Sequence, residues 1–307
     1  LAAANEYTGA TRFGSHGLNR LGGTLRLMHN SALGTSGVVY ERGGTIEVGT
    51  NGLTIANGVS IYNWGGGVRT HRLDLEGTNS ATMSGNMDIR YTAGRGFVTD
   101  VGADDTLTYS GKLYSGGGGN AGVTKAGAGT LILTASNTYW AATQIDAGTL
   151  QVNNATGSAT GSGGVNVNDG GTLGGTGSVA GAASVADGGQ LAAGAGGAGT
   201  LTLAGGLTLN DGAGLSIALD QDGPVGQIEV TGGTFTGASA GSVDINIDMQ
   251  ALPPQDAYTI MDWSDATAVG VESGDFVIAE PYSNAFQIRV VGKSLVLARG
   301  STIFVIR

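Results

Sequence analysis

Residues 125–152 read KAGAGTLILTASNTYWAATQIDAGTLQV, and this stretch decides the fold class. Its two Gly-Thr-Leu segments, 129–133 and 148–152, alternate apolar and polar residues over about five positions, the period of a half-buried strand. Glycine and turn dipeptides punctuate the stretch, which keeps no helical periodicity. It therefore predicts short strands whose inward side chains form the core of the central coils: Leu131, Leu133, Ile145, Leu150 and Val152.

The same tripeptide recurs along the chain. Gly-Thr-Leu begins at residues 23, 129, 148, 171 and 199, with Gly-Thr-Ile at 44 and Gly-Thr-Phe at 233. An imperfect spacing of about 20–30 residues is typical of a solenoid, in which each coil buries its apolar side against the next. A β-sandwich is the competing interpretation, but it favours strand spacings of about 8–12 residues and larger core aromatics. Aromatic residues make up only 6% of this chain, which favours the solenoid.

Composition excludes several classes of protein. The chain has 307 residues, of which 40% are hydrophobic and 12% charged, so it does not have the signature of a disordered protein. Its 59 glycines keep no three-residue period and only 4 prolines accompany them, which excludes collagen. With no cysteine, the chain can form neither a disulfide nor a thiolate metal site.

Charge is distributed unevenly. Residues 126–288 contain no Lys or Arg and fifteen Asp or Glu, whereas residues 1–125 are close to neutral and residues 289–307 carry four basic groups. Nucleic-acid binding depends on basic groups that displace counterions from phosphates. We therefore expect no nucleic-acid partner.

Glycine content divides the chain near residue 240. Residues 1–240 hold 54 glycines and residues 241–307 hold 5. Because solenoids need atypical terminal repeats to cover an exposed core, we expect a β-helical repeat region at 1–240 and a C-terminal cap or terminal β subdomain at 241–307. A separate globular domain is the alternative for the second segment.

The stretch 125–152 closely resembles the autotransporter-associated β-strand repeat, and Asn5, Tyr7, Gly9 and Thr11 repeat part of that pattern. The chain departs from the pattern at Ala135 and at Ala141, where glycine is common in the family. The resemblance implies a right-handed parallel β-helix, all-β with an atypical C-terminal cap, exported as a type V passenger. It implies no catalytic residues.

The sequence begins Leu-Ala-Ala-Ala without an initiator Met, which is typical of the junction left by signal-peptide removal. Cloning or proteolysis would leave a similar start. Together with the resemblance, this start predicts a protein on the bacterial outer surface or in the extracellular space.

Acidic motifs offer little chemistry. Residues 220–223 resemble the start of a calcium loop but lack its third acid and its downstream Glu. Asp104 and Asp105 form a possible carboxylate pair of the kind that polysaccharide-cleaving β-helices use. We interpret both motifs as polar turns.

Other candidate residues are isolated. His16, His29 and His71 have no partner at metal-ligand spacing, and the glycines at 116–119 are not followed by the Lys-Ser/Thr of a phosphate loop. Single aromatics at Tyr62, Trp64 and Trp140 are candidates for stacking on sugar rings. We expect no catalytic residue, no metal or cofactor and no enzymatic activity.

Three functions remain. The composition favours a structural rod, with an adhesin that binds a cell-surface glycan or protein as the alternative and a polysaccharide-active enzyme as the third. Residues 294–307 are β-prone and without acid, so we place an assembly strand there that docks on copies of the same protein. Its final residues are Thr302, Ile303, Phe304, Val305, Ile306 and Arg307. The alternatives are that this strand pairs within its own cap or once led into a translocator.

Overall fold

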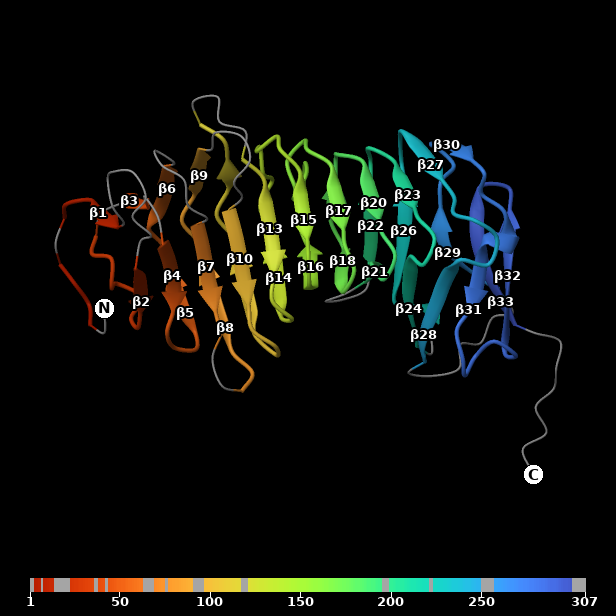
Figure 1. Ribbon diagram of the computed structural model, residues 1–307, viewed down its shortest axis with the longest axis horizontal. Coiled ribbons are helices and arrows are strands. Elements are labelled where there is room, and N and C mark those ends of the chain that lie inside the picture. Colours follow the sequence, from red (N-terminus) through yellow and green to blue (C-terminus); the bar gives the residue numbers. More distant parts are fainter. Residues whose placement is uncertain are drawn as a thin grey trace.

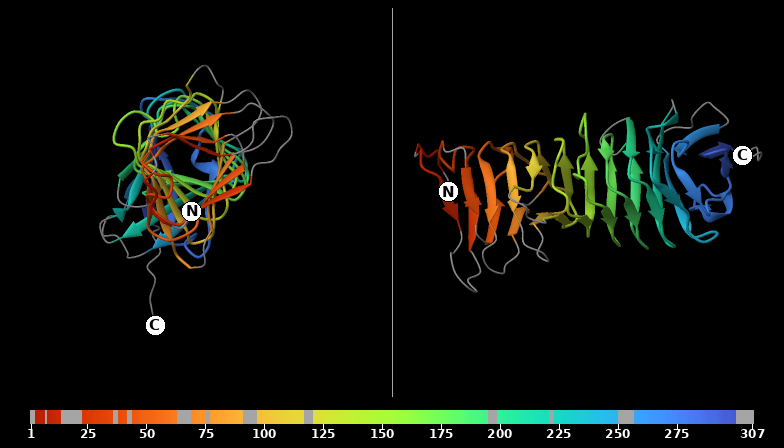
Figure 2. Two further views of the ribbon diagram at one scale, coloured as in Figure 1. Left: turned by 90° about the vertical axis from the view of Figure 1, so that its left-hand side faces the viewer. Right: turned by 90° about the horizontal axis from the view of Figure 1, so that it is seen from above.

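The computed structural model describes residues 3–6, 8–13, 23–35, 38–41, 44–62, 69–74, 77–90, 97–116, 121–194, 199–220, 223–249 and 257–299. These residues form an elongated rod in which strands lie across the long axis (Figure 1). Apart from the antiparallel pairs at 214–224 and 286–299, consecutive strands of the described chain belong to different sheets, and strands of successive coils pair in parallel through most of the rod. Viewed from one end, the coils enclose a closed outline (Figure 2). The fold is a parallel β-helix, as the sequence predicted.

Two sheets run nearly the whole length of the rod, each with 11 strands among the described residues. Sheet B contains β2 (Thr24–Leu27), β4 (Gly44–Val48), β7 (Arg69–Leu73), β10 (Phe97–Val101), β13 (Val123–Ala126), β15 (Thr143–Ile145), β17 (Val165–Val167), β20 (Ala183–Val185), β23 (Leu207–Leu209), β27 (Thr234–Thr236) and β30 (Thr267–Val269). Sheet C contains β5 (Leu53–Ile55), β8 (Ser80–Met83), β11 (Thr106–Tyr109), β14 (Thr130–Leu133), β16 (Gly148–Val152), β18 (Gly171–Gly175), β21 (Gln190–Ala193), β24 (Gly214–Asp220), β28 (Val243–Met249) and β31 (Phe276–Ile278), with β25 (Gly223–Pro224) antiparallel to β24.

The third side of the rod is divided between two smaller sheets. Sheet A contains β1 (Thr11–Phe13), β3 (Val38–Glu41), β6 (Gly58–Tyr62), β9 (Met87–Arg90) and β12 (Leu113–Tyr114). Sheet D contains β19 (Ser178–Val179), β22 (Gly199–Leu203), β26 (Gly226–Val230), β29 (Ala257–Asp262), β33 (Ser294–Arg299) and β32 (Phe286–Val291). A 3-10 turn, η1 (Ser273–Asp275), precedes β31. No helix in the described part of the chain is long and apolar enough to cross a bilayer.

Alternate residues of each strand point into the rod and stack on their counterparts one coil away. In sheet C, Leu131 pairs with Leu107 on one side and with Leu150 on the other. The five residues that the sequence assigned to the central core are all fully buried: Leu131, Leu133, Ile145, Leu150 and Val152. Each such column places apolar surface beside apolar surface along the rod axis, which is the stacking that a solenoid needs for stability.

The glycine of Gly-Thr-Leu has a steric reason to be there. Gly148 adopts φ +62°, and a Cβ at this position would lie 2.5 Å from the carbonyl oxygens of Gly127 and Gly129 in the preceding coil. A side chain would therefore collide with backbone as well as strain the local conformation. At 129, 148 and 171 the tripeptide lies where the chain turns from sheet B to sheet C, whereas at 23 it leads into β2 of sheet B and at 199 it opens β22 of sheet D.

Sheets B and C continue in parallel across residue 240 to β30 and β31, and beyond them β32 and β33 form an antiparallel hairpin. β33 pairs with β29 on one side and β32 on the other. Residues 294–299 are therefore an inner strand, and our assignment of an assembly strand at 294–307 is wrong for this part, because both of its edges are already hydrogen-bonded. Residues 302–307 lie outside the described residues.

Candidate functional site

Asparagine side chains fill a break in the third face of the rod. Sheet A ends at β12 and sheet D begins at β19, and residues 134–142 and 153–164 cross this face without a strand. Asn137 accepts a hydrogen bond from Leu113 N at 2.7 Å and donates one to Ala159 O at 2.5 Å. The buried amide thus links the preceding coil to the following coil by hydrogen bonds. Where this face has strands, backbone hydrogen bonds between the strands make the same link.

Asn154 has the same kind of role one coil later. Its Oδ1 accepts from Ser178 N at 2.9 Å, at the start of sheet D, and its Nδ2 donates to the carbonyl oxygens of Thr156 and Gly157. Buried polar groups in proteins are nearly always paired in this way, because an unpaired one is costly.

Tyr139 anchors the same irregular segment to sheet B. Its side chain is fully buried, and its hydroxyl lies 2.7 Å from Thr143 Oγ1. Burial raises the pKa of Tyr139 well above its usual value, although the hydrogen bond with Thr143 opposes the shift. The phenol therefore stays neutral and acts as a packing and hydrogen-bonding group.

Lys125 is a buried cation held by backbone carbonyls. Its Nζ donates to Ala126 O at 2.8 Å, Gly127 O at 2.7 Å and Ala147 O at 3.0 Å, and Ala147 belongs to the next coil. Loss of hydration lowers the pKa of Lys125 to about 8, and the attraction of Asp100 only partly offsets this. The ammonium thus binds carbonyl groups of two coils at the corner between sheets B and C, where the repeat begins.

Two polar residues precede Lys125 in the inward column of sheet B. His71 pairs in register with Thr99, and Thr99 with Lys125. The Tyr109 hydroxyl, from sheet C, lies 3.2 Å from His71 Nδ1 and 2.9 Å from Thr99 Oγ1. All four side chains are buried, so this cluster bridges two sheets inside the rod. The lack of a ligand partner near His71 in the sequence favours a surface or turn position for it, and that interpretation is wrong because its ring packs in the core.

The carboxylates singled out in the sequence lie in turns. Asp105 is buried and its Oδ1 accepts from both nitrogens of Asn79, whereas its neighbour Asp104 is exposed with φ 64°. Asp220 ends β24, and residues 221 and 222 lie outside the described residues. Within the described ranges no three His, Asp or Glu side chains are placed to hold a metal ion.

The aromatic and histidine candidates do not come together at one site. Trp140 is 48% exposed and follows the buried Tyr139. His29 is exposed in a turn near the first coils, and Tyr62 is the last residue of β6. His16, Trp64 and the glycines at 117–119 lie outside the described residues.

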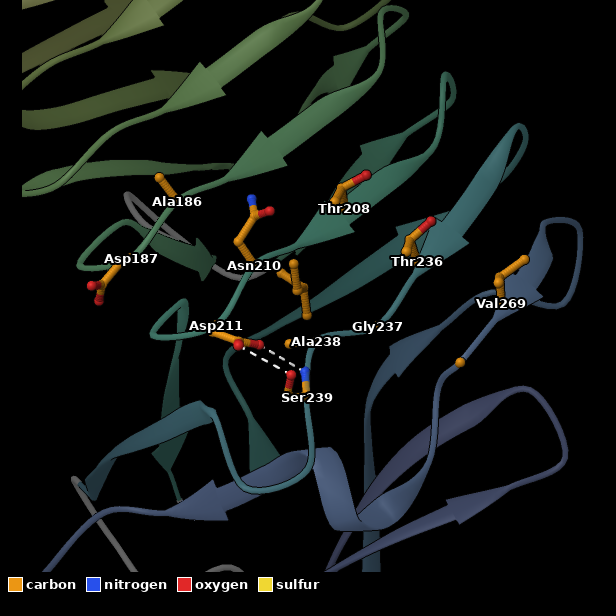
Figure 3. A pocket seen from close by; sticks show the side chains of 12 residues that line it. Ala186, Asp187, Thr208, Asn210, Asp211, Thr236, Gly237, Ala238, Ser239 and Val269 are labelled. Atoms are coloured by element: carbon orange, nitrogen blue, oxygen red, sulfur yellow. Dashed lines mark hydrogen bonds between the residues drawn. The ribbon is translucent and has the colours of Figure 1, made fainter.

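A groove of about 880 Å³, lined by both polar and apolar residues, runs along the corner between sheets B and C in the later coils (Figure 3). Thr208, Thr236 and Val269 lie in register on three neighbouring strands and form one side. Asp187 and Asp211 lie in the turns. Since no Lys or Arg occurs between 126 and 288, the groove suits a neutral or cationic polar partner better than an anionic one.

Asp211 stabilises the turn at this groove. Its carboxylate accepts from Ser239 N at 2.8 Å, from Ser239 Oγ at 3.0 Å and from Ser242 Oγ at 3.1 Å. The bond from the Ser239 backbone, followed by those from the two hydroxyls, lowers the pKa of Asp211. Asp187, one coil earlier, lies over Gly212, where a Cβ would meet its Oδ1 at 2.0 Å.

A family model described as the passenger-associated-transport-repeat matches residues 123–152. The chain carries a passenger-associated transport repeat. The matched segment spans β13 to β16 and contains Lys125, Asn137 and Tyr139. It supplies two stacked strands to sheet B and two to sheet C, so it covers the sheet B and C strands of two successive coils. No curated protein matches the chain.

The repeat points to an autotransporter passenger and to secretion to the cell surface. Lys125, Asn137 and Tyr139 belong to the repeat motif in the sequence, but the motif by itself assigns them no role. In the structure Asn137 and Lys125 connect coils and Tyr139 anchors the segment between them. The motif marks these positions, but their partners follow only from how the coils stack.

Proposed function

We propose that this protein is a structural passenger: a rigid β-helical rod displayed on the bacterial surface or released from it. The observation that carries the proposal is the family repeat at 123–152, whose strands pair with those of the coils before and after it in sheets B and C. Eleven parallel strands spaced by about 4.8 Å span about 50 Å. Coil-to-coil hydrogen bonds and a continuous apolar interior resist bending, which suits a spacer or stalk.

Electron microscopy of the purified protein and protease accessibility on intact cells test this proposal together. We expect uniform rods, and cleavage of the protein by a protease that cannot enter the cells. Globular particles, or a protein cleaved only after the cells are lysed, would contradict it.

Head-to-tail assembly into a fibre is the finer form of this proposal. Sheet C begins with β5 and ends with β31, and each of these strands pairs with only one other strand in the described part of the chain. Stacking the first coil of one copy on the last coil of another would continue the sheet, and such a heterologous contact propagates unless rotation closes a ring. Light scattering against concentration tests this form, because a fibre grows in mass whereas a single rod does not.

Adhesion is the second candidate function, and the groove of Figure 3 favours it. Its carboxylate, amide and hydroxyl groups are suited to the hydroxyls of a cell-surface glycan or to polar groups of a protein. Replacing Thr208 and Thr236 by Val, on the exposed side of the strands, should weaken cell binding and leave the circular dichroism spectrum unchanged. Equal binding by the variant and the parent protein would remove this candidate.

A polysaccharide-active enzyme is the third candidate and has the least support. The acidic pair at 104–105 lies in a turn, and Asp105 is hydrogen-bonded to Asn79. Incubation with a panel of surface polysaccharides, followed by assay for new reducing ends, tests for it.

A further inference from the structure

The C-terminal end of the rod contains an apolar groove of about 430 Å³. Strands β31 and β32 supply most of its lining, and Ser273 and Ser283 complete it. The apolar side chains that line it are Phe276, Val277, Ile278, Phe286 and Ile288. Val277 is 44% exposed, which is high for a branched aliphatic residue.

Both strands that line the groove are the last of their sheets. β31 pairs with β28, and β32 pairs with β33; within the described residues neither strand has a second neighbour. Strand edges of this kind carry backbone groups that proteins pair or cover, because an open edge invites aggregation. The groove therefore combines apolar side chains with backbone positions suited to one more strand.

The chain itself supplies a segment next to this groove. Arg299, at the end of β33, pairs in register with Phe286 in the lining of the groove. The sequence continues with Gly300 and Ser301, followed by the apolar run Ile303-Phe304-Val305-Ile306. The eight residues 300–307 extend over about 26 Å at 3.3 Å each, whereas the three residues of β31 need about 10 Å.

We propose that residues 302–306 occupy this groove in their own molecule and add to β31 as the next strand of sheet C. Side chains alternate along a strand, so Phe304 and Ile306 share one face and Ile303 and Val305 share the other. One of these faces packs on the groove and the other is turned away. Arg299, from which the segment continues, and the groove lie at the same end of the rod, which favours the segment's own molecule over a head-to-tail neighbour as the acceptor.

The inference changes what the segment does in the proposed rod. We first placed residues 302–307 as the strand that joins one copy to the next. In the present proposal they cover the edge of β31 that a neighbour would otherwise use. Removing them should therefore promote association of the rods.

Disulfide mapping tests the proposal, because the chain has no cysteine of its own. Ser283→Cys is combined in turn with a single cysteine at each position from 302 to 306, and the full-length variants are oxidised at low concentration. We expect an intramolecular disulfide whose yield rises and falls at alternate positions, as a strand requires. Ser184→Cys on β20 is the matched control, since it lies in the middle of the rod and should form no bond with the segment.

Two outcomes of the mapping overturn the proposal. Covalent dimers in place of intramolecular bonds would mean that a second copy supplies the strand. Yields no higher than those of the Ser184→Cys control would mean that the groove is not the acceptor. Neither outcome bears on whether the protein is a rod, which microscopy decides separately.

Truncation gives a second, independent measurement. A chain that ends at Arg299 should keep its β-type circular dichroism spectrum and associate more strongly than the full chain by light scattering. Weaker association after truncation would show that the segment works between molecules and would overturn the proposal. If the truncated chain does not fold, two double variants replace it: Phe304→Asp with Ile306→Asp, and Ile303→Asp with Val305→Asp. Only the double variant whose residues face the groove should associate more strongly than the parent protein.

Discussion

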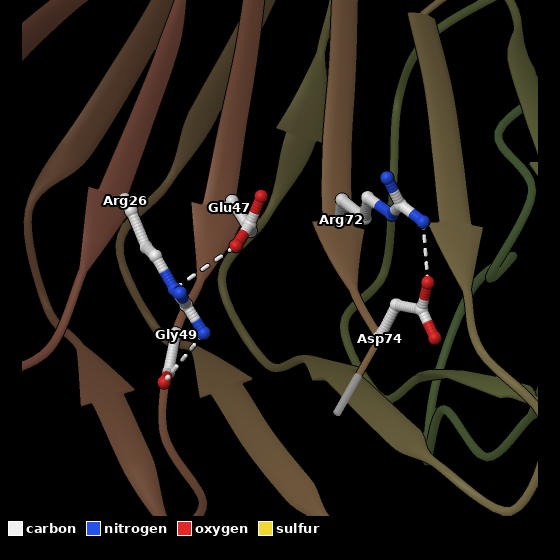
Figure 4. A network of polar contacts seen from close by, with 5 residues as sticks. All are labelled: Arg26, Glu47, Gly49, Arg72 and Asp74. Atoms are coloured by element: carbon white, nitrogen blue, oxygen red, sulfur yellow. Dashed lines mark hydrogen bonds and ion pairs between the residues drawn. The ribbon is translucent and has the colours of Figure 1, made fainter. Parts of the chain in front are cut away.

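The coils before residue 116 and those after residue 121 both contain asparagine side chains that bind the backbone of a neighbouring coil, but the first group adds an exposed column of charges. In the first group, Arg26, Glu47, Arg72 and Asp100 occupy one outward column of sheet B, so that charges of opposite sign face each other from coil to coil. Arg26 Nε lies 3.0 Å from Glu47 Oε1, and Arg72 pairs with Asp74 (Figure 4). Arg72 Nε also lies 3.7 Å from Asp100 Oδ2. The column ends at Ala126, beyond which no basic residue occurs until 289.

The later coils use neutral groups and one buried cation for the same purpose. Asn137 and Asn154 bind backbone groups of adjacent coils, and Lys125 binds the carbonyl oxygen of Ala147 in the coil after its own. Interactions between exposed charges are screened by salt, whereas buried hydrogen bonds are not. One solenoid can thus specify its register in two ways, and the two ways should respond differently to mutation, pH and salt.

The largest effect is expected from charge placed in the core of the repeat coil. Leu131→Ala should destabilise the protein by about 2–5 kcal/mol, and Leu131→Asp by more, because the carboxylate would be unpaired in an apolar interior. Urea unfolding followed by circular dichroism measures both. Ile132→Asp is the matched control, since Ile132 is the partly exposed residue next to Leu131 on β14 and should tolerate the charge far better. Equal loss in the two Asp variants would contradict the register of this strand.

Asn137→Ala tests the side-chain connections of the third face. The substitution leaves Leu113 N and Ala159 O without their partner, and each buried unpaired group costs about 1–3 kcal/mol. Asn153→Ala is the control, because the Asn153 side chain accepts from the exposed Thr176 N and donates only a long bond to the nearby Gln151 Oε1. We expect a loss of stability in the first variant and little change in the second. Indistinguishable unfolding curves would mean that water replaces the Asn137 amide.

Much of this architecture could be predicted from the sequence. The period of Leu131 and Leu133 indicated inward-facing residues, and the spacing of Gly-Thr-Leu indicated coils, because both follow from local geometry. The connections made by Asn137 and Lys125 could not be predicted, since their partners lie about twenty residues away and depend on how coils stack. The inward position of His71 was missed for the same reason: its partner Tyr109 belongs to another sheet.

The buried position of Lys125 predicts a stability that depends on pH. Its pKa is about 8 in the folded protein and 10.5 in the unfolded chain, so the unfolded chain binds more protons between these values. Stability should therefore rise from pH 8 to pH 10, by on the order of 2 kcal/mol, and be constant in this respect below pH 8. Above pH 10 the raised pKa of Tyr139 acts in the opposite direction, because the unfolded chain then loses the phenol proton first. Lys125→Met should abolish the rise between pH 8 and 10; a Met variant with an unchanged pH profile would exclude Lys125 as its source.

The smallest effect, and the one that most directly separates the two groups of coils, concerns the charged column. Glu47→Gln removes the negative charge between Arg26 and Arg72 while keeping the size of the side chain. Exposed ion pairs contribute about 0.2–1 kcal/mol each, so the loss should be of this size at low salt. It should shrink as salt is raised towards 1 M, where the screening length falls to about 3 Å.

Gln144→Ala, on the outward side of β15, is the control from the later coils and should show the same small change at every salt concentration. Limited proteolysis locates the effect. In Glu47→Gln, cleavage should begin near the first coils, and its excess over cleavage of the parent protein should be greatest at low salt. If the Glu47 variant is as stable as the parent protein at all salt concentrations, the alternating charges do not contribute to the register of the first coils.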